Sequence, residues 1–366
     1  MSNPDRLLSF SEWMAENNRT YYARKAPGKE GDFITSPLVH RAFGEAVARQ
    51  IMEMDEQLGH PDPFLLIEFG GGSGQLALDI LKCLAEESPR LFGRLSYGIS
   101  DFPESIKHFQ ERFENELPGA LNNVTFLPPF SPELARKIPN LPGCILANEF
   151  LDALPIHLIV KRDTEYREIF IGEQGEKFEI IELPPSPAVL HFIETNHLDL
   201  QDGCFAEINL EMQSWIRTVS SSLQRGFVLV LDYGGPGKEL RSDRYPQGTL
   251  RGFKNHRLTD VFTLQLGEGD WTSDIDFSIL ARLAKKEGFS VTGYSTQGNF
   301  LLGLGVAERM PIFRKKDLNL DELKEHLAMK FLFHPEGMGN AFNVLGLHKG
   351  MDQPRLSGFS LRQEKL

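Results

Sequence analysis

The fold of this 366-residue chain is decided by the stretch Phe64-Leu65-Leu66-Ile67-Glu68-Phe69-Gly70-Gly71-Gly72-Ser73-Gly74. Its apolar part predicts a buried strand, which ends in an acid at Glu68 two residues before a run of glycines. Glycine accepts positive φ angles and lets the backbone approach a ligand closely, and the first turn of a following helix offers unpaired amides. The stretch therefore predicts a strand, a ligand-binding turn at Gly70, Gly71, Gly72 and Gly74, and a helix. A plain strand-to-helix turn without a ligand is the alternative.

Short apolar runs alternate with amphipathic stretches around this turn. This alternation is typical of strand-helix-strand units, and hence of a mainly parallel sheet with helices on both faces. The predicted strands are 64–69, 95–100, 124–127, 144–147 and 227–231, and the predicted helices are 75–87, 104–115, 210–223 and 277–287. We therefore expect an α/β fold that binds its ligand at the carboxyl edge of the sheet.

Two segments depart from this alternation. Residues 1–60 are predicted to form a helical amino-terminal cap. Residues 156–203 alternate Ile, Phe and Tyr with Lys and Glu and contain glycine turns and a proline cluster, which predicts a β-rich insertion or lid. Residues 61–155 and 204–366 would then form the ligand-binding core together.

Composition and charge restrict the partners of the chain. The formal charge of −12 and the pI near 5.4 argue against nucleic acid, whose binding needs Lys and Arg to neutralise phosphates. A run of about 18 apolar residues and a signal pattern are both missing, so we expect no membrane span and a cytoplasmic protein. Cys83, Cys144 and Cys204 are widely spaced, which predicts neither a disulfide framework nor a metal site. A basic partner or a small cofactor fits better, and the oligomeric state, a homodimer included, stays open.

The spacing of the glycines selects the cofactor. A dinucleotide-binding turn needs a third glycine where this chain has Gln75. The tighter spacing suits S-adenosylmethionine, which has no pyrophosphate, and Glu68 would lie beside its positively charged methionine end. Asp101 ends the second strand, where a carboxylate can accept hydrogen bonds from both ribose hydroxyls. The alternative for Asp101 is a helix cap ahead of Pro103.

Two motifs accompany the glycine turn, Gly31-Asp32-Phe33-Ile34-Thr35-Ser36-Pro37 upstream and Asn148-Glu149-Phe150-Leu151-Asp152-Ala153-Leu154-Pro155 downstream. With them the chain resembles the MidA family, the bacterial relatives of the mitochondrial complex I assembly arginine methyltransferase. The likeness continues through Leu231-Asp232-Tyr233-Gly234, Gly248-Thr249-Leu250-Arg251, Asp276-Phe277 and Thr296-Gln297-Gly298-Asn299-Phe300-Leu301, so it covers nearly the whole chain. The chain departs from the family pattern at Gly71, where a proline is common, and at Asp274, where a histidine is usual.

The resemblance implies a class I methyltransferase with a Rossmann-like fold that binds S-adenosylmethionine. It also implies a protein substrate with an arginine side chain as the methyl acceptor, a respiratory-complex subunit being one candidate. Methyl transfer from a sulfonium is a direct displacement, so the enzyme mainly aligns the acceptor and excludes water. A guanidinium acceptor is charged, and it needs carboxylates that bind it bidentately and accept a proton late.

Three residues of the downstream motif are the catalytic candidates. Glu149 directly follows the predicted fourth strand and is the first choice for binding the guanidinium. Asp152 would complete an acidic clamp, and Asn148 would orient the acceptor or the amine of the cofactor. The alternatives are an exposed acid at a strand end for Glu149 and a helix cap for Asp152.

The upstream motif supplies a second set of cofactor candidates. Gly31, Asp32, Thr35 and Ser36 form a stretch rich in hydroxyls and backbone amides, which suits closure over the cofactor's carboxylate or methionine chain. Ser36 followed by Pro37 also has the pattern of a helix N-cap, and helix initiation is an equally good interpretation.

Two other functions compete with protein methylation. One is a small-molecule or nicotinamide-dependent enzyme, and Gln75 argues against dependence on nicotinamide. The other is an assembly factor or chaperone that kept the cofactor pocket and lost turnover, against which the acids Glu68, Asp101 and Glu149 argue. His256 and Tyr233 remain outside the catalytic set, because a single His or Tyr is more often a packing or surface residue.

Overall fold

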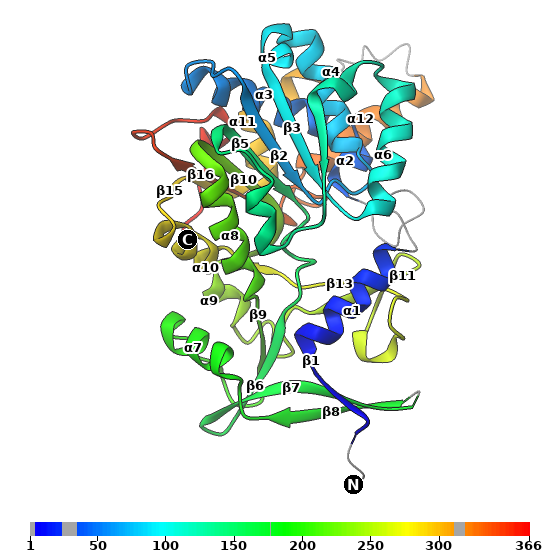
Figure 1. Cartoon of the computed structure of the whole chain (residues 1–366), viewed down its shortest axis with the longest axis vertical. Helices are drawn as coiled ribbons and strands as arrows, with labels where there is room; N and C mark the ends of the chain where they lie inside the picture. The colour runs from blue at the N-terminus through cyan, green and yellow to red at the C-terminus, as the bar shows by residue number, and fades with distance from the viewer. Residues whose placement is uncertain (1–3, 24–34, 176, 311–318) are drawn as a thin grey trace.

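The computed structural model describes residues 4–23, 35–175, 177–310 and 319–366. It contains one large sheet with helices on both faces and two smaller antiparallel sheets. Figure 1 shows the large sheet in the upper part of the molecule and the five-stranded sheet below it, with helix α1 (Phe10–Tyr22) between them.

The large sheet has the strand order β15-β16-β10-β5-β2-β3-β4. Its strands are β2 (Phe64–Phe69), β3 (Leu95–Ser100), β4 (Val124–Leu127), β5 (Leu141–Asn148), β10 (Leu223–Gly235), β15 (Ser290–Thr296) and β16 (Phe342–Lys349). Strands β10, β5, β2, β3 and β4 are parallel, whereas β16 is antiparallel to both of its neighbours. A short strand, β14 (Ile275–Asp276), pairs with the end of β10. Because β2, β3, β5 and β10 are parallel, their carboxyl ends meet at one edge of the sheet.

Alternate residues of the central strands pack into opposite layers. In β2, Phe64 and Leu66 belong to one core cluster, and Leu65, Ile67 and Phe69 belong to the other. The first cluster joins the sheet to α3 (Ala42–Gln57), α4 (Gln75–Glu87), α5 (Pro89–Arg94), α6 (Pro103–Glu116) and α11 (Gln297–Gly303). The second joins it to α7 (Pro187–Asn196), α8 (Glu211–Ser222) and α10 (Phe277–Lys286). Burial on both faces explains why β2 is a continuous apolar run and does not alternate with polar residues.

The α/β fold predicted from the sequence is confirmed. The predicted strands 64–69, 95–100 and 124–127 and the predicted helix 75–87 have those bounds in the structure. The remaining predicted elements of the large sheet are present with shifted ends. Strand β10, for example, is longer than the predicted 227–231 because its polar ends also pair with neighbours.

The five-stranded sheet is built mainly from the segment predicted to be β-rich. It contains β6 (His157–Arg162), β7 (Glu165–Gln174) and β8 (Lys177–Leu183), and it also includes β1 (Arg6–Ser9) and β9 (Phe205–Ile208) from outside that segment. Residues 1–60, predicted to be helical, therefore contain a strand as well. Local sequence does not predict β1, because its partner is the distant strand β7.

A three-stranded sheet fixes α1 against the rest of the molecule. It consists of β11 (Arg251–Lys254), β12 (Arg257–Thr259) and β13 (Asp270–Thr272), none of which the sequence predicted. Trp13 of α1 packs on Trp271 of β13 with ring centroids 4.6 Å apart, and Phe10 lies 5.7 Å from Trp13. The other helices are α2 (Ser36–Val39), α9 (Gly237–Leu240) and α12 (Leu320–Phe333). Within the described ranges, none of the helices has the length and apolar character needed to cross a membrane.

Candidate active site

A cavity of about 440 Å³ lies at the carboxyl edge of the large sheet. Its walls come from the ends of β2, β3, β5 and β10, from α1, and from β11 and β13. Two groups of residues define its chemistry. The glycine region comprises Glu68, Gly70, Gly71, Gly72, Ser73 and Asp101, and the acidic region comprises Tyr22, Glu149, Asp152, Tyr233 and Asp270.

Backbone geometry explains the glycines of the turn. Gly70, Gly72 and Gly74 have φ angles of 73°, 58° and 72°, a region that side chains disfavour. Gly71 is different, because a Cβ atom there would lie 2.6 Å from Cγ2 of Ile99. A side chain at Gly71 would require the side chains of Ile99 and Phe109 to shift, so glycine lets the turn follow the sheet closely.

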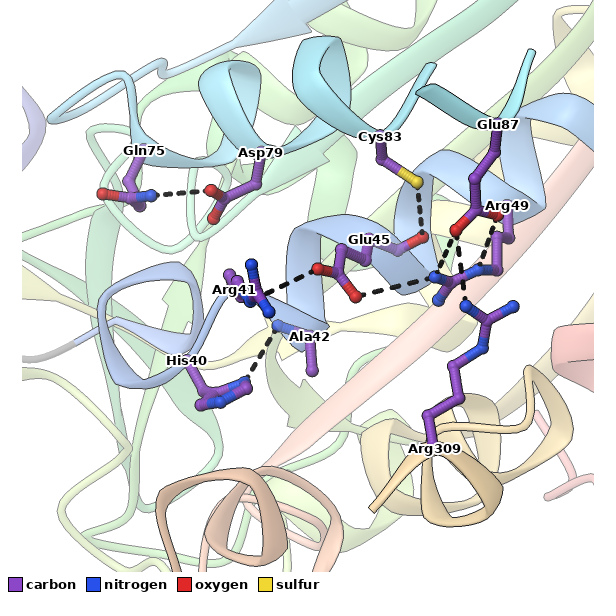
Figure 2. A network of polar contacts seen from close by, with 10 residues as sticks. All are labelled: His40, Arg41, Ala42, Glu45, Arg49, Gln75, Asp79, Cys83, Glu87 and Arg309. Carbon is purple, nitrogen blue, oxygen red and sulfur yellow. Dashed lines mark hydrogen bonds and ion pairs between the residues drawn. The ribbon is translucent and has the colours of Figure 1, made fainter. Parts of the chain in front are cut away.

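Polar contacts hold the turn and the helix that follows it. The guanidinium of Arg112 donates to the carbonyl of Ser73 (3.2 Å) and to Oε1 of Gln75 (2.5 Å). Nε2 of Gln75 in turn donates to Oδ1 of Asp79 (2.8 Å), as Figure 2 shows. The same figure shows the ion pair between Arg49 of α3 and Glu87 at the end of α4. The sequence did not single out Arg112, because a helix arginine has no signal that predicts such a contact.

Asp101 lies beside the glycine turn. Its Oδ2 accepts a hydrogen bond from the amide of Gly72 (2.7 Å), and its Oδ1 accepts one from the amide of Phe102 (2.6 Å). The N-cap position of α6 is Phe102, so the alternative of a helix cap at Asp101 is wrong. Burial raises the pKa of Asp101 to about 6, which the two amide donors partly oppose. Each carboxylate oxygen keeps lone-pair capacity for a further donor from the cavity.

Glu68 forms part of the cavity wall and is 1% exposed. It accepts a hydrogen bond from the hydroxyl of Tyr97 on the neighbouring strand β3. Burial, opposed by the hydrogen bond from Tyr97 and aided by the nearby Asp101 carboxylate, raises the pKa of Glu68 to about 7. The structure thus places a buried acid two residues before the turn, as the sequence indicated.

Glu149 begins the irregular turn that follows β5. Its φ angle is 50°, and its Oε1 accepts hydrogen bonds from the amide of Ser36 (3.2 Å) and from Nδ2 of Asn148 (3.3 Å). The side chain is half-buried in the cavity wall and is not a freely exposed strand-end acid. Burial and the charge of Asp152 hold the pKa of Glu149 well above its usual range.

Asp152 is 4% exposed and lies in the same turn. Within the described part of the chain, its Oδ1 is buried and has no hydrogen-bond partner. Burial, followed by the charges of Asp232 and Asp270, raises the pKa of Asp152 well above its usual range. No helix begins at this residue, so the helix-cap alternative is wrong. A buried carboxylate oxygen without a donor beside an open cavity is suited to a cationic ligand.

The other residues of the acidic region come from α1, β10 and β13. The hydroxyl of Tyr22 donates to Oδ1 of Asp270 (2.8 Å), and its ring stacks on Phe102 with centroids 5.6 Å apart. Tyr233 also borders the cavity, and Arg251 lies over its ring at 5.1 Å. Tyr22, Tyr233 and Asp270 are far apart in the sequence. Of these three, only Tyr233 belongs to one of the sequence motifs, and it was not among the predicted catalytic residues.

Two of the residues discussed from the sequence lie away from the cavity. Oδ1 of Asp274 accepts an ion-pairing hydrogen bond from Arg251 (2.6 Å), so the residue that replaces the usual histidine anchors an arginine. His256 is exposed in the connection between β11 and β12. Neither residue contributes to the cavity wall.

The upstream motif is only partly described. Gly31 and Asp32 lie outside the described residues. Thr35 borders the cavity, and Ser36 donates its amide to Glu149 and its hydroxyl to Oε1 of Gln297 (3.1 Å). Thr35, not Ser36, is the N-cap of α2, and its side chain makes no capping hydrogen bond. The segment therefore joins Glu149 to the start of α11.

No group of His, Cys, Asp and Glu residues in the described ranges is arranged to hold a metal ion. The acids of the acidic region instead border a cavity that is also lined by the aromatic residues Tyr22, Phe102 and Phe253.

The cavity fits S-adenosylmethionine. The glycine region offers a backbone surface that a Cβ atom would obstruct, next to a carboxylate that can accept from a pair of hydroxyls. The acidic region offers Glu149 and Asp152 to a positive charge. The cavity can therefore accommodate a nucleoside with a sulfonium group on one side and a cationic acceptor on the other.

Comparison with known proteins agrees with this geometry. The chain is 28% identical to the protein arginine methyltransferase NDUFAF7 homolog, mitochondrial, of Drosophila melanogaster, over 93% of this chain and 81% of that protein. It is 27% identical to the human protein arginine methyltransferase NDUFAF7, mitochondrial, over 92% of this chain and 77% of the human protein.

Two solved structures from Burkholderia thailandensis share the fold. The first, an uncharacterised protein, is 26% identical, has a TM-score of 0.83 and matches 98% of this chain and 91% of its own. The second, bound to S-adenosyl-homocysteine, is 24% identical, has a TM-score of 0.83 and matches 98% of this chain and 92% of its own. A family model for S-adenosyl-L-methionine-dependent methyltransferases matches residues 46–295, which is more than half of the sequence. The chain belongs to this family and is an S-adenosylmethionine-dependent methyltransferase.

Proposed function

We propose that the methyl acceptor of this enzyme is the guanidinium group of an arginine side chain in a protein. The observation that carries the proposal is that Asp152 and Glu149 both line the cavity, and that the buried Oδ1 of Asp152 has no donor among the residues that the structure describes. Two carboxylates around one opening match the two edges of a planar guanidinium, which donates in pairs. The names of the Drosophila and human relatives support the same acceptor.

The glycine region would hold the cofactor. The backbone of Gly70 to Ser73 would lie against it, and Asp101 would accept hydrogen bonds from its ribose hydroxyls. Glu68 would place a carboxylate near the positively charged methionine end. When bound, S-adenosylmethionine supplies an electrophilic methyl group on a sulfonium. The residues of the chain orient the methyl group relative to the acceptor and form no covalent bond with it during transfer.

The acidic region would bind and align the acceptor. Glu149 is held by Ser36 and Asn148 through a single oxygen, Oε1, which leaves Oε2 for a guanidinium N–H. Asp152 would accept from the other edge of the same group. Both carboxylates have pKa values raised by burial, and a bound cation would favour their ionised forms. After methyl transfer, Glu149 is the group placed to accept the surplus proton.

Helix α1 would exclude water from the reaction. Its residues Asn18 and Tyr22 border the cavity opposite the sheet, and Nδ2 of Asn18 donates to the carbonyl of Ala153 (2.7 Å). This bond ties α1 to the turn that contains Glu149 and Asp152. A dry, charged site of this kind strengthens every interaction with a cationic acceptor.

The test is methylation of proteins in a lysate of source cells from which the gene has been deleted. The purified chain is added with radiolabelled S-adenosylmethionine, the proteins are hydrolysed, and the labelled amino acids are identified. We expect label in methylarginine, and we expect it to disappear with Glu149→Gln but not with Glu111→Gln, which alters an exposed acid on α6. Label in methyllysine, in methyl esters or in small molecules only would overturn the proposed acceptor. Binding of S-adenosyl-homocysteine without any transfer would favour the assembly-factor alternative.

A further inference from the structure

Asp232 is a buried carboxylate that directly supports the catalytic turn. It lies near the end of β10 and is 0% exposed. Its Oδ2 accepts hydrogen bonds from three consecutive amides, those of Phe150 (3.3 Å), Leu151 (2.9 Å) and Asp152 (3.3 Å). Its Oδ1 accepts a fourth from the amide of Tyr233 (2.9 Å). A single side chain thus collects the backbone donors of the segment between Glu149 and Asp152.

The turn needs such an acceptor because the sheet ends where it begins. Asn148 is the last residue of β5 paired with β10, opposite Leu231, and the amide of Glu149 donates to the carbonyl of Leu231 (2.9 Å). Beyond this point the amides of the turn have no strand partner, while Leu151 is 0% exposed. Buried amides without acceptors are costly, so Asp232 replaces the missing strand.

The backbone of the turn is also strained at its first residue. Glu149 has a φ angle of 50°, a left-handed conformation that a side chain adopts only when its surroundings impose it. The three amides held by Asp232 follow directly after this residue. Their common acceptor therefore fixes the direction in which the Glu149 side chain leaves the backbone, and it fixes the position of Asp152 as well.

We infer that Asp232 is a positioning residue for methyl transfer, which holds the turn 149–152 so that Glu149 and Asp152 both face the acceptor. The inference rests on the proposed function. Asp232 is not part of the cavity wall. Its effect passes through the backbone of the turn, in the way that supporting residues orient the groups that bind a ligand.

Asp276 provides a matched control. It is the last residue of β14 and the N-cap of α10. Its Oδ1 accepts from the amide of Ile279 (2.9 Å), and its Oδ2 accepts from Arg241 (2.6 Å). Like Asp232 it is a largely buried carboxylate that binds backbone, but it lies away from the cavity. Asp276→Asn therefore reports the general effect of losing such a carboxylate.

The first measurement is amide hydrogen exchange on the full chain with S-adenosyl-homocysteine bound. In Asp232→Asn we expect exchange of the amides of residues 150–152 to accelerate by about tenfold or more, because asparagine replaces one of the two acceptor oxygens with an NH2 group that cannot accept from backbone amides. Asp276→Asn should leave these amides unchanged. Unchanged exchange in Asp232→Asn would overturn the inference. If Asp232→Asn does not fold, Asp232→Glu, which keeps the charge and displaces it, is measured in its place with the same expectation.

The second measurement is a double-mutant cycle on the methylation rate, with the gene-deleted lysate as acceptor and saturating S-adenosylmethionine. We expect Asp232→Asn to slow transfer by about 10- to 100-fold and to change the affinity for S-adenosyl-homocysteine by less than about threefold. Because Asp232 acts through Glu149 and Asp152, the variant with both Asp232→Asn and Glu149→Gln should lose less rate than the product of the two single losses. Losses that multiply would overturn the positioning role.

The two measurements separate the inference from the proposed function. If the wild-type chain shows no arginine methylation, the proposed function fails and the positioning role fails with it. The exchange data would still decide whether Asp232 holds the turn. If arginine is methylated but exchange and the cycle show no coupling, only the inference fails.

Discussion

The glycine region and the acidic region of the cavity are built in different ways. The glycine region consists of one contiguous turn and the ends of two adjacent strands, and its contacts to Asp101 are made by backbone amides. The acidic region is assembled from α1, the turn after β5, the end of β10 and β13, and its chemistry lies in side chains. A site made of backbone groups, such as the glycine region, is therefore encoded by a local stretch of sequence. A site made of charged side chains, such as the acidic region, depends on the whole fold.

Asp101 in the glycine region also differs from the acids of the acidic region in how far its surroundings raise its pKa. Both oxygens of Asp101 accept amide hydrogen bonds, and its pKa is raised only to about 6. Glu149 also accepts two hydrogen bonds, whereas Oδ1 of Asp152 has no partner among the described residues. Burial, together with the charge of Asp152 at Glu149 and the charge of Asp232 at Asp152, raises the pKa values of both acids well above their usual range. The acidic region therefore gains the most from a bound cation, and we expect its variants to affect turnover more than folding or cofactor binding.

The largest effect should come from Glu149→Gln. This change removes the charge that faces the acceptor and the group that accepts its proton, so we expect the methylation rate to fall by about 10²- to 10³-fold. The affinity for S-adenosyl-homocysteine, measured by calorimetry, should stay within about twofold of the wild type, because the glycine region is unchanged. A loss of cofactor affinity as large as the loss of rate would break the separation between the two regions.

Asp101→Ala should produce the opposite pattern. The variant loses two charge-assisted hydrogen bonds to ribose hydroxyls, which predicts a decrease of about 100-fold in affinity for S-adenosyl-homocysteine. At saturating S-adenosylmethionine the methylation rate should recover most of its wild-type value. Asp199→Ala, which removes an exposed partner of Lys161, is the control and should bind normally. Normal binding by Asp101→Ala would show that the carboxylate does not hold the nucleoside.

Most of the large sheet could be predicted from the sequence because its signals are local. Strand β2 is a continuous apolar run followed by glycines, and α4 has apolar residues at helical spacing, so both were predicted with their observed bounds. The five-stranded sheet was predicted in part. Strand β1 was missed, because its residues Arg6 to Ser9 become a strand only by pairing with β7.

The site was predictable to the same extent. Glu68 lies near the end of a buried strand of a parallel sheet, and Asp101 and Glu149 directly follow two others, so their meeting at one edge could be derived from their positions. Tyr22 and Asp270 could not be found in this way, because their contact depends on the packing of Trp13 on Trp271. The three amides at Asp232 depend equally on a turn whose shape no local pattern gives.

The pH dependence of the rate sharpens the comparison further. Glu149 must be ionised to bind a guanidinium. Because its pKa is raised, Glu149 becomes protonated at a higher pH than an ordinary glutamate does when the pH is lowered. With saturating S-adenosylmethionine, we expect the rate to fall by about tenfold per pH unit below that pKa. Glu149→Gln should have a flat profile over the same range. Equal slopes in both proteins would assign the titration to another group.

The last expected effect is on stability, from Glu68→Gln in the glycine region. Burial raises the pKa of Glu68 from 4.5 to about 7, so between these values the folded chain keeps a proton that the unfolded chain has lost. This contribution to stability is present at low pH and is lost as pH rises toward 7. Glutamine cannot ionise, and its carbonyl can still accept from Tyr97.

We therefore expect the free energy of unfolding of Glu68→Gln, relative to the wild type, to increase by at most about 3 kcal/mol between pH 5 and pH 8. Urea unfolding at both pH values, with Glu111→Gln as the exposed control, measures this difference. A constant difference between Glu68→Gln and the wild type would mean that Glu68 is already ionised in the folded chain at pH 5. In that case the glycine region, like the acidic region, would hold an uncompensated charge ready for the positive end of the cofactor.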